Sequence, residues 1–153
     1  MNEKNTMHTL FWSHLEDLRA SENATRRALE SLLDMTPAAD MRATMNSWLG
    51  QNRDQVDRLR AILRARPEDL STESLPPAES ARWETYLGPG LQESGTVVAV
   101  QFLTRYKIAA YQAARHWAIM LGYLDIVTPL QQSLMEEHRQ AEQLSAFQEG
   151  YRS

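Results

Sequence analysis

Residues 96–121 read TVVAVQFLTRYKIAAYQAARHWAIML, and this stretch decides the fold class. Its apolar residues recur every three or four positions, as they do along one face of an α-helix. They are Val100, Leu103, Ala110, Ala114, Trp117 and Leu121. The stretch contains neither Gly nor Pro, and Gly122 follows it directly, as glycine often follows the last residue of a helix. We therefore predict one long helix over 96–121.

Three further segments on either side of this helix show the same periodicity. They cover about residues 6–35, 38–66 and 124–147. Pro37 separates the first two segments and Pro67 ends the second, because proline inside a helix removes a hydrogen bond and clashes with the preceding turn. Pro129 lies early in the last segment, where its missing N–H is tolerated. Residues 67–95 hold four of the six prolines and are read as a long connection with one short helix.

The lengths of the connections predict the topology. Short turns near residues 36–38 and 122–124 force the helices that they join to be antiparallel neighbours. The long connection at about 67–95 permits one crossover between the second and third helices. We therefore expect an all-α, up-down four-helix bundle with one long crossover, formed by residues 1–153 as a single domain.

The composition excludes several classes of function. The formal net charge is −4 and Lys and Arg are scattered among Asp and Glu, so we expect no nucleic-acid binding. The absence of cysteine excludes thiol catalysis and thiolate metal sites, and is compatible with a reducing compartment. No apolar run is long enough for a membrane span and the start lacks a signal peptide's apolar core, so we expect a cytoplasmic protein without membrane contact. No P-loop, nucleophile elbow or His-Glu-x-x-His motif is present, which disfavours classical enzyme chemistry.

Charged and polar residues interrupt the apolar stripes at the middle of every predicted helix. Glu22, Lys107 and Glu137 lie at the midpoints of the first, third and fourth stripes. The second helix contributes a polar patch at the same level, made of Trp48, Gln51, Asn52 and Gln55. Because the midpoints of antiparallel helices lie at similar heights, we predict that these groups meet in one internal polar layer.

Two buried carboxylates need a positive charge between them, since each otherwise raises the pKa of the other. A metal ion is one solution, and the ammonium group of Lys107 is another. A third interpretation is structural: long charged side chains reach the edge of the bundle and leave only their carbon chains inside.

Four motifs in order resemble one known family. They are LEDL with SEN at 15–23, QVDRL at 55–59, RYKIAAY at 105–111, and LQQSL with two glutamates at 130–137. Together they resemble the YciE/YciF-like branch of the ferritin-like superfamily, bacterial stress-associated proteins of similar length. The resemblance implies a ferritin-like bundle, a homodimer, and a non-haem di-iron or related metal centre held by carboxylates and histidines of all four helices.

The resemblance also implies which positions would hold the metal. Glu22 and Glu137 match ligand positions of the first and fourth helices. The other matched positions hold residues that bind iron poorly or not at all: Trp48, Gln51, Thr104, Lys107 and Ala141. We therefore expect no bound metal cofactor, and a polar core layer at the former metal site formed by Glu22, Trp48, Gln51, Thr104, Lys107 and Glu137, with Lys107 in place of the metal.

These expectations favour a non-enzymatic ferritin-like protein that acts as a stress-associated or protein-interaction module, as a homodimer or with an unidentified protein partner. The alternative is a metal-binding ferritin-like protein with an altered iron or manganese centre at Glu22, Glu137 and His138. A third class is a small-molecule binder that uses the polar core of the bundle.

Overall fold

The computed structural model describes residues 3–67 and 93–152. Four long helices make up most of this part: α1 (Glu3–Met35), α2 (Ala39–Arg64), α4 (Glu93–Leu121) and α5 (Val127–Arg152). A single turn of 3-10 helix, η1 (Leu124–Ile126), precedes α5. The residues described contain no β-strand. The prediction of an all-α fold is therefore confirmed.

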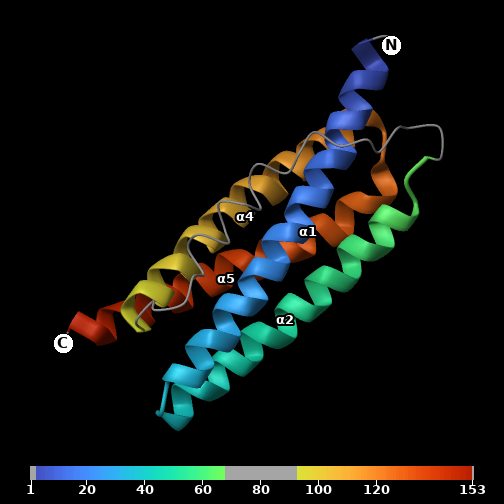
Figure 1. The fold of residues 1–153 in the computed structure, drawn as a ribbon. Coiled ribbons are helices and arrows are strands. Elements are labelled where there is room, and N and C mark those ends of the chain that lie inside the picture. Colours follow the sequence, from blue (N-terminus) through green and yellow to red (C-terminus); the bar gives the residue numbers. More distant parts are fainter. Residues whose placement is uncertain (1–2, 68–92, 153) are drawn as a thin grey trace.

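The four helices lie side by side as a bundle (Figure 1). Helix α1 packs against α2 and α4, α4 packs against α5, and α2 also contacts α5. Helix α2 ends at the end of the bundle where α1 begins, whereas α4 begins at the opposite end (Figure 1). This up-down arrangement requires one long crossover between α2 and α4, as predicted. The short helix expected in that connection falls on residues 68–92, which lie outside the described part.

The ends of the helices differ from the predicted ones by a few residues. Helix α4 begins at Glu93 rather than at residue 96, and so includes Gly95. The helix predicted over 124–147 is divided into η1 and α5, and α5 extends to Arg152. The division has a chemical reason: the carbonyl of Asp125 would accept an α-helical bond from residue 129, which is a proline without an N–H.

The turn between α4 and α5 depends on Gly122. This residue has a φ of 85°, in the left-handed region that glycine adopts without a steric penalty. Its N–H donates to the carbonyl of Ile119, and the N–H of Tyr123 donates to the carbonyl of Ala118 at 2.8 Å. These two bonds satisfy carbonyls that the end of a helix otherwise leaves unpaired. These bonds explain why α4 ends just before Gly122, as predicted.

The apolar core is divided into two clusters along the bundle axis. The first lies toward the N-terminal end of α1 and includes Phe11, Leu15, Leu59, Ala114 and Leu130. The second lies toward the C-terminal end of α1 and includes Leu29, Leu32, Met45, Val100 and Leu144. Between them lie buried polar residues from all four helices: Ser21, Glu22, Thr25, Asn52, Gln55, Thr104, Lys107, Ser133, Glu137 and Gln140. The polar layer thus separates two apolar halves of one core.

None of the helices in the described residues is both long enough and apolar enough to span a membrane.

Two leucines at the same end of the bundle predict how the cost of leucine truncation depends on burial. Leu15 has none of its surface exposed, whereas Leu124 is 65% exposed. We expect Leu15→Ala to lower the free energy of unfolding by about 2–5 kcal/mol, because it opens a cavity in the core. The same truncation at Leu124 should cost less than about 1 kcal/mol. Urea unfolding followed by far-UV circular dichroism measures both changes, and equal losses would contradict the assigned burial.

Candidate functional site

Lys107 lies at the centre of the polar layer. Its Nζ is 2.9 Å from Oε1 of Glu22 and 2.7 Å from Oε1 of Glu137. The three side chains come from α4, α1 and α5, and none of them exposes any surface to solvent. Each lies at the middle of an otherwise apolar helix face, so helix packing alone brings one ammonium and two carboxylates together. The structure thus places three of the sequence-predicted site residues in direct contact.

Helix α2 joins the layer through an amide. The Nδ2 of Asn52 donates to Oε2 of Glu22 at 3.0 Å and to the backbone carbonyl of the same residue at 2.8 Å. Glu22 is therefore fixed on one oxygen by Asn52 and approached on the other by Lys107. Oε1 of Glu22 lies at ion-pair distance from the ammonium of Lys107, and Glu137 accepts a hydrogen bond from the same ammonium.

A second ion pair borders the layer between α2 and α5. Arg58 forms a two-pronged pair with Glu136, with N–O distances of 2.7 and 3.0 Å. Arg58 also donates to the hydroxyl of Ser133, and Gln55 donates to Glu136 at 3.2 Å. The adjacent glutamates therefore have separate partners, Glu137 inside the bundle and Glu136 at its edge. This pair was not predicted, although Arg58 follows Gln55 by three residues and so shares its side of the helix.

The other predicted members of the layer take different positions. Trp48 is buried, and its indole N–H donates to Oε1 of Gln143 at 2.6 Å. Gln143 lies on α5 and reaches the ring from the bundle edge, which the sequence could not indicate. The hydroxyl of Thr104 donates to the carbonyl of Val100 within its own helix. Trp48 and Thr104 are therefore buried beside the ion pairs, and each donates to an acceptor outside the ion pairs.

His138 does not join the layer. It is exposed to solvent, while its neighbour Glu137 is fully buried. Successive residues on a helix point about 100° apart, so both cannot face the core. The alternative ligand set of Glu22, Glu137 and His138 is not assembled. Within residues 3–67 and 93–152, no three His, Asp or Glu side chains form a group that could hold a metal ion.

Burial and ion pairing act against each other on the charges of the layer. Burial raises the pKa of Glu22 from 4.5 to about 7, although Lys107 lowers it and Glu137 adds to the rise. Burial alone lowers the pKa of Lys107, but Glu137 and Glu22 outweigh it and leave the pKa above its ordinary value. At neutral pH Lys107 is therefore charged, and Glu22 is divided between its protonated and its ionised form.

The layer also retains unused hydrogen-bonding atoms. Oε2 of Glu137, Oε1 of Gln51 and Nε2 of Gln140 are buried without a hydrogen bond. Burial raises the pKa of Tyr111 well above its ordinary value, and Glu22 and Glu137 add to this rise, so the phenol stays neutral. Each unpaired polar atom costs about 1–3 kcal/mol when it is buried. The layer is thus a place where the fold gives up stability to keep polar groups inside.

The raised pKa of Glu22 predicts a stability that depends on pH. The folded protein keeps the Glu22 proton up to about pH 7, whereas the unfolded chain loses it near the ordinary pKa of 4.5. Raising the pH through this window therefore lowers the free energy of unfolding, by on the order of 1–3 kcal/mol, since one pKa unit corresponds to about 1.4 kcal/mol. Urea unfolding at a series of pH values should show this loss in the wild type and a flatter profile in Glu22→Gln.

The matched control is Glu30→Gln, which removes an exposed glutamate of the same helix. It should keep the slope of the wild type. If the profile of Glu22→Gln has the same slope as those of the wild type and Glu30→Gln, Glu22 is not the group that titrates.

Solved structures with the same fold cover nearly the whole chain. The stress protein YciF of E. coli is 20% identical, with a TM-score of 0.75, over 93% of this chain and 94% of that one. YcfI of Rhodopseudomonas palustris is 22% identical, with a TM-score of 0.74, over 95% and 96%. Ferritin-like, diiron-carboxylate proteins of Bacillus anthracis are 12% identical, with a TM-score of 0.70, over 97% and 99%. The predicted ferritin-like fold is therefore confirmed.

Sequence comparison places the chain in a family. No curated protein sequence matches it significantly. The family described as "Domain of unknown function (DUF892)" matches residues 6–152, which is almost the entire chain. The match includes the polar layer, the whole of α2, α4 and α5, and α1 from residue 6 onward. The chain belongs to the DUF892 family, and its fold is that of YciF and the ferritin-like bundles.

Proposed function

We propose that this chain is a non-enzymatic, stress-associated ferritin-like protein in which the ammonium of Lys107 takes the place of metal ions. The observation that carries the proposal is the contact of Lys107 with Glu22 and Glu137 at 2.9 and 2.7 Å in the centre of the bundle. The fold of the ferritin-like, diiron-carboxylate proteins of Bacillus anthracis supports the comparison with a metal centre. Lys107 supplies the positive charge that two buried carboxylates need.

The donor atoms of the layer do not fit a di-metal centre. In the described part of the chain, two fully buried carboxylates converge, and a cation between them would meet the ammonium of Lys107 at contact distance. On α2, the amide of Asn52 points its N–H toward Glu22, and an N–H cannot bind a cation. On α4, the hydroxyl of Thr104 is already bonded to its own helix. Di-iron sites of four-helix bundles instead draw carboxylates and histidines from all four helices.

Two further properties favour a function in protein–protein contact over catalysis. No group of the layer is both exposed and poised to transfer a proton, because Glu22, Lys107 and Glu137 are all sealed inside. Helix α4 exposes the large apolar side chains Val98 and Phe102, which are 40% and 52% exposed. Such residues are common at interfaces between proteins. We therefore propose that the chain forms a homodimer. A cytoplasmic location is also proposed, and the stress role is proposed from the E. coli relative.

The ion-pair layer predicts a large effect of removing its cation. Lys107→Met keeps most of the side-chain volume but leaves Glu22 and Glu137 without a positive partner. We expect a loss of about 3–5 kcal/mol in the free energy of unfolding, because uncompensated charge stays buried. Adding Glu22→Gln and Glu137→Gln to the same chain should recover most of this loss. Chemical denaturation of the wild type and of both variants measures these changes.

The control for this series is an exposed ion pair. Arg26 lies 3.9 Å from Glu30 on the surface of α1, and its side chain is 53% exposed. Arg26→Met should cost less than about 1 kcal/mol. A triple variant no more stable than Lys107→Met would show that the lysine acts through packing instead of charge.

Metal binding separates the proposal from its alternative. After treatment with EDTA and anaerobic loading with Fe(II) or Mn(II), the wild type should retain well below one ion per chain by elemental analysis. Lys107→Glu should retain more metal than the wild type, because a third carboxylate replaces the ammonium. Stoichiometric metal in the wild type that Glu22→Gln abolishes would overturn the proposal and favour an altered iron or manganese centre.

A further inference from the structure

A groove on the surface of the bundle is lined mainly by arginine. It lies between α1 and the C-terminal half of α2 and has a volume of about 340 Å³. Its lining residues are Glu16, Arg19, Arg60, Leu63, Arg64 and Arg66. Four guanidinium groups against one carboxylate leave the groove with a formal charge of +3, whereas the whole chain carries −4. Positive charge is thus concentrated at one place on an acidic protein.

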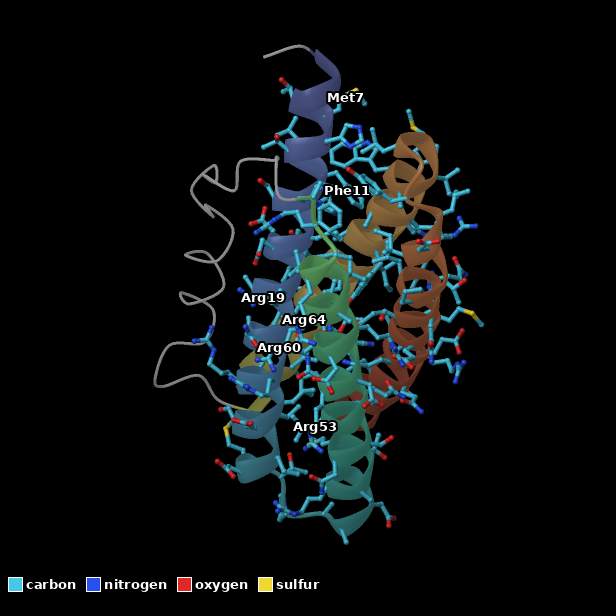
Figure 2. The ribbon with its side chains drawn as sticks, turned by 90° about the vertical axis from the view of Figure 1, so that its right-hand side faces the viewer. Met7, Phe11, Arg19, Arg53, Arg60 and Arg64 are labelled. Carbon is cyan, nitrogen blue, oxygen red and sulfur yellow. The ribbon has the colours of Figure 1, made fainter. Side chains whose placement is uncertain are left out.

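The arginines of the groove come from both helices and approach one another across the seam. Figure 2 shows Arg19 on α1 next to Arg60 and Arg64 on α2, while Arg53 lies nearer the start of α2. Arg60 and Arg64 are four residues apart, so they share one face of the helix. Two like charges at this spacing destabilise a helix slightly. These arginines are scattered along the sequence, and they come together only where α1 and α2 meet in the folded bundle.

The one carboxylate of the groove does not neutralise it. Glu16 contacts Arg19 at 3.1 Å and Arg66 at 3.8 Å, so it is shared between two guanidinium groups. Arg60 and Arg64 form no ion pair or hydrogen bond with any residue in the described ranges 3–67 and 93–152. Among the residues that the structure describes, Arg60 and Arg64 on the α2 side thus have no negatively charged partner, and Arg19 shares Glu16 with Arg66.

We infer that this groove binds a small molecule carrying a diphosphate or a comparable pair of phosphoryl groups. A guanidinium presents its N–H donors in a plane that matches two oxygens of a phosphate. Two phosphoryl groups carry enough negative charge to balance the net charge of the groove, and each of them offers oxygens to a separate guanidinium group. The volume is near the lower limit of about 300 Å³ for small-molecule pockets, which fits a short polyanion. Leu63 gives the groove one apolar wall for the rest of the ligand.

The test is calorimetric titration of the full chain with inorganic diphosphate at low and at physiological salt. We expect saturable binding by the wild type, and diphosphate should bind at least about fivefold more tightly than inorganic phosphate because it contacts more guanidinium groups. The double variant Arg60→Gln/Arg64→Gln should weaken diphosphate binding at least about tenfold. Both side chains are exposed, so thermal unfolding should show an intact fold.

The matched control is Arg53→Gln/Arg139→Gln, which removes two exposed arginines outside the groove. It should bind diphosphate within about twofold of the wild type, since its loss of charge is the same and only the place differs. If both double variants weaken diphosphate binding equally, the binding depends on net charge alone, and the inference is overturned. No binding by the wild type would overturn it directly. Binding of duplex DNA or RNA that depends on Arg60 and Arg64, without diphosphate binding, would also overturn it.

Discussion

The rest of the structure depends on the contact of one ammonium with two carboxylates in the middle of the bundle. Glu22, Lys107 and Glu137 come from three different helices, so the ion pairs hold α1, α4 and α5 at one relative height. A slip of one helical turn would move a charge by about 5.4 Å and leave it buried without its partner. Apolar packing above and below the layer is more tolerant, because leucine and alanine faces fit one another in several positions. The polar layer therefore specifies the register that the apolar halves stabilise.

Helix α2 is held by a different kind of contact. It touches the central charges only through the amide of Asn52, and binds α5 through Arg58 with Glu136 and through Trp48 with Gln143. The last two contacts lie at the edge of the bundle, where water competes with them and reduces their value. The three fully buried charges thus come from α1, α4 and α5, and α2 covers the remaining side of the layer.

The fold could be predicted from the sequence because it depends on periodicity and on connection lengths. The site could be predicted in part: a lysine in the middle of an apolar stripe, such as Lys107, has to find buried partners wherever the helix packs. The Arg58–Glu136 pair, the bond from Trp48 to Gln143 and the arginine groove could not be predicted. Each depends on how far two helices rotate toward one another, and no pattern within one helix contains that rotation. The start of α4 was misplaced because Gly95 favoured a connection, whereas packing of Val97 and Val100 extends the helix through it.

The separation of the three layer charges onto three helices has a consequence for the variation that the gene can accept. A neutral substitution of Lys107 alone leaves two buried carboxylates without a cation, whereas a neutral substitution of one glutamate still leaves Lys107 with one carboxylate. Position 107 is therefore less free to change than either glutamate, although 85 residues of sequence separate it from Glu22. A change of Lys107 to glutamate would place a third carboxylate beside Glu22 and Glu137. That form would need a cation from solution in place of the ammonium.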